Sequence, residues 1–377
     1  MELYFFIIDN TKLIKWYEGD GKEMANRIFD LTETKGTFQC AGIINGVAKD
    51  KFYTEKKTTT KKDWRSVNFG CEYDDKQTIY IDLNGMPQTN VYFSKKNQET
   101  NKTETKSVPW GNRHSFNEDG WRLIGVNLGL TKVVNSDGKA VNDKKTMTPF
   151  DACAYIRNNL KDETSTFIRG NIEFSSFTDK DGGKRRSIKY VPNQISLCKD
   201  IDFTEYDYID KKPTHAFTQT IVFMGIDKEL ENDKDTGRFI VSAKIVTYSD
   251  IVDAEFIIVN KELANLFKKN LKPYHAITVY GNIDSVRKVK EVASADSVWG
   301  EENTMNSVSA PFKTEMVITG ATPATIDKET YTEKNIAEAM AKIRNAQTAE
   351  QNFSGTTSNS GWGDDGFGDE VDFDEEW

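Results

Sequence analysis

Two segments of the chain decide its fold, namely residues 159–172 (NLKDETSTFIRGNI) and residues 270–283 (NLKPYHAITVYGNI). Asn-Leu-Lys opens each segment and Gly-Asn-Ile closes it, so all six matched positions keep the same offset of 111 residues. A helical pattern precedes each match and strand-like alternation follows it. One triplet can recur by chance, but two in register and in the same context indicate a duplicated domain.

The order of elements around each match is strand, strand, strand, helix, strand, strand. Five strands with a helix between the third and fourth are the order of an OB-fold, a Greek-key barrel. The shared glycine suits the strand bend that closing a small barrel requires. We therefore predict a mainly β protein with two tandem five-stranded OB-fold barrels. The competing interpretation is two unrelated α+β domains with a coincidental motif.

On this interpretation the chain of 377 residues has five parts. They are an N-terminal hairpin and helix extension at 1–34, a first OB-fold domain at 35–200 with an insertion at 86–147, a second OB-fold domain at 213–322, a C-terminal helix at 328–346, and a disordered linker with an acidic tail at 347–377. Within the extension, alternation predicts a hairpin over 3–17, and apolar spacing predicts a helix over 22–30.

Apolar patterns and turn residues set the elements of each barrel. For the first barrel they predict strands at 37–47, 65–73, 77–83, 167–177 and 188–197, a helix at 150–161, and a turn at 179–187. A further strand is expected at 121–130, inside the insertion. For the second barrel they predict strands at 217–227, 238–248, 253–259, 276–286 and 312–320, and a helix at 261–272. A last helix is expected at roughly 330–345.

OB-folds bind oligonucleotides across one barrel face and with the loops that join strands 1–2 and 4–5. In the first repeat these loops are residues 50–63 and 179–187, and both are basic. Their cations are Lys51, Lys56, Lys57, Lys61 and Lys62 in the first loop and Lys180, Lys184, Arg185 and Arg186 in the second. Such loops would form a local positive groove, and neutralised phosphates would release counterions there.

Flat side chains near this groove are candidates for stacking on bases. The strongest is Trp64, which lies beside the basic loop and next to Arg65. The other candidates in the first repeat are Phe69, Tyr73, Tyr80, Phe174, Phe177 and Tyr190. Alternate residues of a strand face the barrel core, so about half of these are expected to be ordinary core residues.

The insertion adds Trp110, Arg113, Trp121 and Arg122. They either extend the groove, or Trp110 packs over a barrel end. In the second repeat the strand 1–2 loop, 227–237, is acidic, which favours a structural or protein-binding role for that barrel. Cations and aromatics that remain as possible contacts there are Arg238, Tyr248, Tyr280, Arg287, Lys288 and Lys290.

The C-terminal segment carries most of the net charge of −9. It holds eight acidic residues without Lys or Arg, and without it the chain has 51 acidic against 50 basic residues. Four aromatic residues interrupt the acidic run: Trp362, Phe367, Phe373 and Trp377. This composition predicts a disordered segment that docks on a partner, whereas a solvated charge run is the plainer alternative.

Other chemistry finds no support in the sequence. Four cysteines without paired spacing and three isolated histidines do not suit a zinc site, and they fit a reducing cytoplasm. Asp179-Lys-Asp181 resembles a calcium loop too briefly to hold the ion. No catalytic constellation, metal or cofactor is therefore expected. The N-terminal apolar run reads as a strand rather than a signal peptide, and no segment is long enough to span a membrane.

Taken together, the barrels around Gly-Asn-Ile and the acidic tail that ends at Trp377 resemble bacteriophage single-stranded DNA-binding proteins. Two barrels in one chain and Trp in place of the usual final Phe depart from that family. The resemblance implies a non-enzymatic protein of the host cytoplasm that coats single-stranded DNA without sequence preference in replication, recombination and repair. Its tail would recruit replication and recombination proteins. The alternative is a protein-binding or inhibitory module that holds no nucleic acid.

Overall fold

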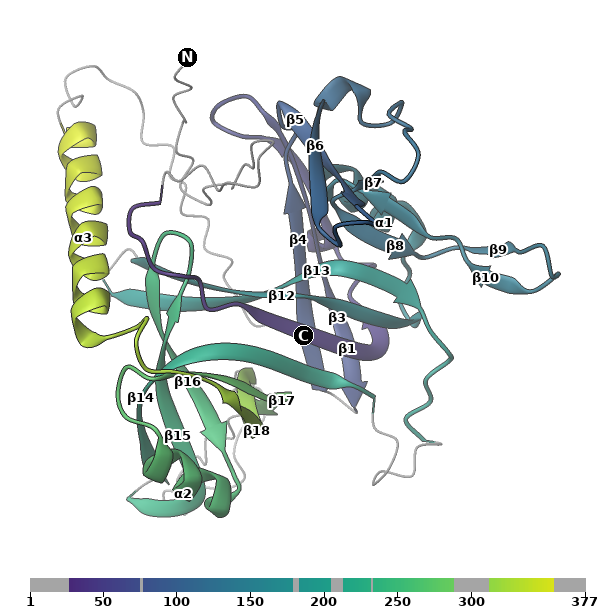
Figure 1. The fold of residues 1–377 in the computed structure, drawn as a ribbon. Coiled ribbons are helices and arrows are strands. Elements are labelled where there is room, and N and C mark those ends of the chain that lie inside the picture. Colours follow the sequence, from purple (N-terminus) through teal and green to yellow (C-terminus); the bar gives the residue numbers. More distant parts are fainter. Residues whose placement is uncertain are drawn as a thin grey trace, which may run out of the picture.

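The computed structural model describes residues 27–74, 77–178, 183–204, 213–231, 233–287 and 312–355 (Figure 1). The predicted hairpin at 3–17 and the tail aromatics lie outside these residues. The predicted helix at 22–30 is wrong for its described part, because residues 27–30 have no helical structure. They belong instead to a segment that packs on the second barrel through Phe29 and Leu31.

The first barrel is a closed sheet of five strands. Its elements are β1 (Gly36–Asn45), β3 (Asp63–Asp74), β4 (Gln77–Gly85), α1 (Pro149–Asn159), β12 (Ser165–Thr178) and β13 (Lys184–Leu197). The hydrogen-bonded order is β1-β3-β4-β13-β12 and back to β1, with β4 and β13 parallel and the other pairs antiparallel. This is the OB-fold order, with the helix between the third and fourth strands.

The second barrel repeats this topology. Its elements are β14 (His215–Glu231), β15 (Lys234–Val246), β16 (Ile251–Ile258), α2 (Lys261–Asn270), β17 (Ala276–Arg287) and β18 (Phe312–Asp327). The order β14-β15-β16-β18-β17 closes on β14, with β16 and β18 parallel. The prediction of a mainly β protein with tandem OB-folds is therefore confirmed, and the alternative of unrelated α+β domains is wrong.

The two matched glycines have the same structural role. Gly170 in β12 and Gly281 in β17 each sit beside a register shift against the last strand of their barrel. A Cβ atom at Gly170 would lie 2.0 Å from the carbonyl oxygen of Val191, and one at Gly281 would lie 1.9 Å from that of Val317. The close approach of the two backbones thus requires glycine at both positions.

A pairing between the first strands joins the barrels. Antiparallel β1 and β14 place Phe38 directly opposite Phe217. Phe38 also lies opposite Gly170 and Phe217 opposite Gly281, so the two phenylalanines are equivalent positions of the repeat. A local two-fold axis therefore passes through this pair. One cluster of buried side chains runs through both barrels across the junction.

Each barrel also contacts its partner through the hairpin of its fourth and fifth strands. From the first barrel, Ser176 donates a 2.6 Å hydrogen bond to Asp250, and Phe174 lies 6.5 Å from Phe256 between ring centroids. From the second barrel, the backbone amide of Ser285 donates to the hydroxyl of Tyr73 at 3.0 Å. The exchange of hairpins follows the same two-fold relation as the strand pairing.

The insertion forms its own small sheet and also extends the barrel. The strand 1–2 connection holds the 3-10 helix η1 (Asp50–Phe52) and β2 (Tyr53–Lys57), and the insertion holds β5 (Asn90–Lys96), β6 (Thr103–Pro109), η2 (Trp110–Asn112), β7 (Arg122–Leu123), β8 (Val126–Gly129), β9 (Lys132–Val134), β10 (Ala140–Asn142) and β11 (Lys145–Met147). The predicted strand at 121–130 is split, because β7 joins the small sheet whereas β8 pairs with β13.

The helices begin at polar caps. Thr148 accepts a hydrogen bond from the amide of Asp151 at the start of α1, and Asn260 accepts from Glu262 and Leu263 at the start of α2. The last helix, α3 (Glu333–Gly355), packs on the second barrel through side chains that include Ile336 and Ile343. It extends beyond the predicted end, so residues 347–355 are helical rather than linker.

Candidate nucleic-acid interface

The outer face of β3 and β4 is the part of the first barrel that matches an oligonucleotide-binding surface. Burial alternates along β3, so Ser66 and Asn68 point outward while Val67 and Phe69 fill the core. On β4 the outward residues include Tyr80, which is 47% exposed, and Asp82. The result is a polar sheet surface with one large exposed ring.

Four of the predicted stacking residues lie in the core instead. Phe69, Tyr73, Phe174 and Tyr190 are all buried, because each occupies the inward position of its strand or hairpin. Tyr190 packs edge-on against Phe38, and burial raises the pKa of its phenol. These four side chains cannot stack on a base, and the prediction is corrected for them.

Tyr80 and Trp64 have the outward parity that stacking needs. Burial of part of the Tyr80 ring raises the pKa of its hydroxyl, so the ring is neutral at physiological pH. Trp64 is half-buried and pairs across the strands with Lys56, whose ammonium lies 5.2 Å from the indole centroid. Trp64 therefore lies at one end of the outer face, where β3 extends beyond the barrel with β2.

The hairpin of β2 and β3 carries the predicted basic loop. Lys56, Lys57, Lys61 and Lys62 are exposed, and Lys51 is exposed at η1. Lys57 lies 3.7 Å from Asp63, which offsets part of the charge. The hairpin nevertheless keeps more cations than anions at its end, beside Trp64.

Arg65 is occupied within the protein. Its guanidinium pairs with Glu55 at 2.8 Å and lies 4.0 Å from the ring centroid of Phe150. Burial acts to lower the pKa of Arg65, but hydrogen bonding and charge from Glu55 outweigh it and raise the pKa. The residue ties the β2–β3 hairpin to α1, so contact with a phosphate would cost these interactions.

The hairpin of β12 and β13 lies at the opposite end of the outer face. Lys184, Arg185 and Arg186, predicted in a turn, belong to β13 and pair with Thr178, Phe177 and Ser176 of β12. Alternation divides them between two sides. Arg186 forms an ion pair with Glu255 of the second barrel, whereas Phe177, which is 53% exposed, and the exposed Arg185 lie on the other side.

The insertion residues are mostly structural. Trp110 packs edge-on against Phe150, and the Arg113 guanidinium lies 4.2 Å from the Trp110 ring centroid. Trp121 packs on the small core of the insertion. Of the two alternatives for Trp110, packing over a barrel end is the one observed, while Arg122 is exposed on β7.

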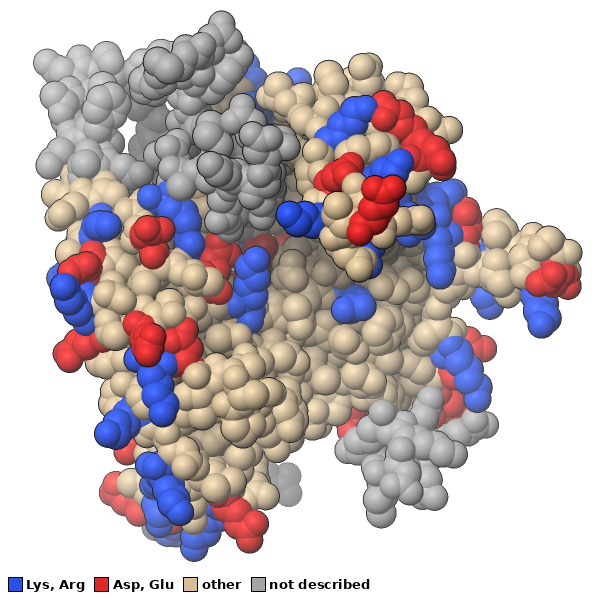
Figure 2. All heavy atoms as spheres, in the orientation of Figure 1, with Lys and Arg blue, Asp and Glu red and all other residues tan. Residues whose placement is uncertain are grey.

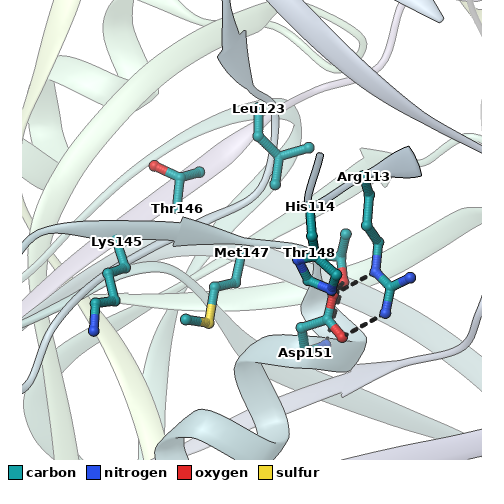
Figure 3. A pocket seen from close by; sticks show the side chains of 8 residues that line it. All are labelled: Arg113, His114, Leu123, Lys145, Thr146, Met147, Thr148 and Asp151. Atoms are coloured by element: carbon teal, nitrogen blue, oxygen red, sulfur yellow. Dashed lines mark hydrogen bonds and ion pairs between the residues drawn. The ribbon is translucent and has the colours of Figure 1, made fainter. Parts of the chain in front are cut away.

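A pocket of about 290 Å³ lies between the insertion and the start of α1 (Figure 3). Arg113 donates to both carboxylate oxygens of Asp151, at 2.8 and 3.0 Å, on one side of the pocket, and Lys145 lies on the opposite side. Burial acts to raise the pKa of Asp151, but hydrogen bonds from Arg113 and Thr148 lower it below its usual value. The pair thus fastens the insertion to the helix.

The charged side chains on the corresponding face of the second barrel are held in ion pairs. Glu255 binds Arg186, and Lys244 binds Asp253 at 2.7 Å. Arg238, predicted as a contact, pairs with both Glu229 and Glu315. Tyr280 is 46% exposed, but it lies on β17, opposite Gly320 of β18, and so not on the strands β15 and β16 that form this face.

The charges explain why no global field marks the interface. Figure 2 shows lysine and arginine side chains interspersed with acidic ones around the rim of this view, with few charges over β1 and β12 in the middle.

Among the described residues no group of three His, Cys, Asp or Glu side chains could hold a metal ion. Burial raises the pKa of Cys153 to about 12, which keeps this thiol protonated. None of the described helices is long and apolar enough to cross a membrane.

Sequence reasoning missed the polar outward residues of the interface. Asn68 and Asn84 lie on the outer face, and Lys189 of β13 lies 3.8 Å from Asp82. The signal was the alternation itself: in a strand whose Val67, Phe69 and Cys71 are buried, the residues between them must face outward. Most of the aromatic residues predicted to stack occupy inward positions instead.

These barrels define a tandem OB-fold protein. The sequence matches the model of the YorF family over residues 95–355, more than half of the chain, and the protein belongs to that family. No curated protein sequence matches it.

Among solved structures, two of the single-stranded DNA binding protein from Thermus aquaticus are similar. A deletion variant has 10% identity and a TM-score of 0.37, covering 80% of this chain and 98% of that chain. The wild type has 10% identity and a TM-score of 0.36, covering 77% and 93%. At these TM-scores the likeness gives no basis for transferring a function.

Proposed function

We propose that the protein binds single-stranded DNA without sequence preference along the outer face of the first barrel. The observation that carries the proposal is the exposed Tyr80 ring on a polar sheet face that ends in basic hairpins on both sides. Trp64 and the lysines of the β2–β3 hairpin lie at one end, and Phe177 and Arg185 lie at the other. Rings stack on bases of any sequence, and the cations contact phosphates.

The direction of the strands gives the approximate extent of the site. Trp64 lies near the start of β3, and the distance from it to Asp74 at the other end of the strand is roughly 30 Å at about 3.3 Å per residue. This length suits a few nucleotides, within the range of about 4–16 that one OB-fold covers. The second barrel serves as a scaffold that holds the β12–β13 hairpin in place.

The wider role follows from the same proposal. A protein that coats exposed strands acts in replication, recombination and repair, in this case of a bacteriophage in the host cytoplasm, and it has no catalytic task. The acidic tail, with Trp362, Phe367, Phe373 and Trp377, recruits replication and recombination proteins, and DNA displaces the tail from the basic hairpins. Deletion of residues 361–377 then leaves or raises affinity for single strands and abolishes partner capture. Lower affinity after deletion would contradict tail displacement.

The decisive measurement is fluorescence anisotropy of labelled oligo-dT titrated with the full chain over a range of salt concentrations. Each neutralised phosphate contributes a slope of about −0.7 to log K against log salt. The double variant Lys61→Ala/Lys62→Ala is expected to make the slope shallower by about 1.4. Lys268→Ala/Lys269→Ala, on the helix of the second barrel, is the matched control and keeps the slope.

Competitors separate the remaining possibilities in the same assay. Unlabelled oligo-dT should displace the probe, while duplex DNA should compete poorly. Competition by single-stranded RNA measures whether the protein prefers deoxyribose or ribose. An absence of binding at low salt would reject the proposal. It would favour a protein-binding module, for which the acidic end of the second barrel is the motivating feature.

A further inference from the structure

The hairpin of β9 and β10 projects from the body of the protein, at the right of Figure 1. It forms a two-stranded sheet of its own. Val133, Val134 and Val141 are exposed, Val134 by 72%. The register pairs Val133 with Val141 and Val134 with Ala140, so both faces of the hairpin carry apolar side chains.

Such a hairpin is unusual for a surface that meets only water. A lone two-stranded hairpin is marginally stable, and exposed valines on both faces gain nothing from solvent. Apolar side chains clustered at a projecting end mark an interaction surface. The exposed valines therefore indicate that another protein surface binds the hairpin.

The charge around the hairpin restricts what can cover it. Residues 131–145 contain four lysines and two aspartates. Lys145 pairs with Asp143 at 2.9 Å, which leaves Lys132, Lys139 and Lys144 against Asp137. A matching surface should therefore be apolar at its centre and acidic at its edge.

The end of the β14–β15 hairpin has these properties. Leu230 is 60% exposed there. Residues 227–238 contain five acidic and three basic residues. Lys228 pairs with Asp235 and Arg238 with Glu229, which leaves the exposed acids Asp227, Glu231 and Asp233 near Leu230 against one exposed base, Lys234.

The other exposed apolar pair on the second barrel is a poorer match. Val259 and Leu266 are exposed at α2, but that helix carries three lysines, Lys261, Lys268 and Lys269, against one acid, Glu262. Like charges oppose the approach of the β9–β10 hairpin. The sign of the charge therefore favours the β14–β15 end.

We propose that the β9–β10 hairpin of one copy docks on the β14–β15 end of a second copy of this chain. The two surfaces belong to different barrels and lie far apart, with β14 and β15 at the lower left of Figure 1. Because the two surfaces lie far apart on each copy, a pair joined by one contact leaves a free β9–β10 hairpin on one copy and a free β14–β15 end on the other, so the contact continues into a ring or a row of copies. This self-association goes beyond DNA binding and does not require it.

Sedimentation velocity of the full chain without DNA tests the contact. The small surfaces predict weak association, below the size of stable interfaces, so the wild type should grow beyond a dimer as its concentration rises. Val134→Asp and Leu230→Asp each place a charge in the contact and should weaken association by about tenfold or more. Leu266→Asp is the matched control and should associate like the wild type.

Mixing the two variants gives the sharpest result. Each variant keeps one intact surface, so an equimolar mixture should form pairs that stop at two copies. Dimers of Leu230→Asp alone would overturn the proposal, because they would indicate contact between two β9–β10 hairpins. A wild type that stays monomeric up to the order of 1 mM would also overturn it.

A charge exchange covers the case in which Val134→Asp simply disorders the hairpin. Lys139→Glu should weaken association, and Lys139→Glu with Glu231→Lys in the same chain should recover it. Failure of the exchange to recover association, with circular dichroism spectra unchanged, would reject the charge complementarity. Titration of oligo-dT with the same variants tests DNA binding separately, so a failure of one proposal is distinguishable from a failure of the other.

Discussion

The two barrels share a topology and differ in what lies on it. Both close in the same strand order, need glycine at the same bulge and place an equivalent phenylalanine at their junction. The first barrel presents Tyr80 and basic hairpins, while the same face of the second holds its charges in ion pairs, one of them between Glu255 and Arg186 of the first barrel. The two barrels thus share the strand order and the glycine that close the sheet, and they differ in the charges of their outer faces.

The largest expected effect tests the equivalence at the junction. Phe38 and Phe217 are almost completely buried, and Phe→Ala in a core typically costs about 3–5 kcal/mol. Phe38→Ala and Phe217→Ala should lower the free energy of unfolding by similar amounts, measured by urea denaturation. Because the two residues are direct neighbours, the loss of unfolding free energy in the double variant should differ from the sum of the two single losses. A loss at one position alone would contradict the two-fold relation.

The matched glycines give the next effect. Gly170→Ala and Gly281→Ala force a methyl group against a backbone carbonyl, so each should cost about 1–3 kcal/mol in thermal or urea unfolding. Gly111, which has open space around its Cβ position and no positive φ, is the control and should tolerate alanine. A neutral Gly281→Ala would show that the second barrel tolerates a different closure.

Two exposed tyrosines test the functional difference. Tyr80→Ala should weaken binding of oligo-dT by about 1–3 kcal/mol, the usual contribution of one stacked base. Tyr280→Ala removes an equally exposed ring from the second barrel and should leave affinity unchanged. Anisotropy titrations measure both, and Tyr80→Phe should keep most of the affinity because the ring remains. Equal losses for the two alanine variants would place the DNA on both barrels.

The smallest effect concerns pH. The folded protein lowers the pKa of Asp151, so the stability that this carboxylate contributes is fully present above its unfolded pKa of about 3.9. That contribution is lost as the pH falls through the lower folded pKa. Asp151→Asn should reduce the pH dependence of the melting temperature in this acid range. The pH dependence near pH 7 should not change. An unchanged acid profile would contradict the role of the pair with Arg113.

Local patterns predicted the elements well where both periodicity and caps were present. The helix after Thr148-Pro149 and the hairpin of β3 and β4 followed from the sequence because alternation and capping are local properties. The strand at 121–130 failed because the two halves pair with different sheets, β7 with β5 and β8 with β13. Only tertiary pairing separates them.

The loops of the candidate site were predicted from the sequence, but its sheet surface only in part, because Tyr80 was named there and Asn68 and Asn84 were not. Basic residues of the β2–β3 hairpin are exposed as expected, since lysines are rarely buried. Phe69 and Tyr190 were misassigned because an aromatic residue fits a core as readily as a stacking surface. The parity of the strand, fixed by which neighbours are buried, decides between the two.

The repeated triplets and the local periodicity were enough to predict a duplicated five-stranded unit with a helix and a shared glycine, because alternation, helical spacing and repeats are local properties of the sequence. Tertiary structure decided how the units combine. The pairing of Phe38 with Phe217, the exchange of hairpins through Ser176 and Tyr73, and the ion pairs that occupy Arg65 and Arg113 all join residues far apart in the chain. Such contacts depend on geometry that no local pattern records, and they determine which aromatic and basic side chains remain available to a ligand.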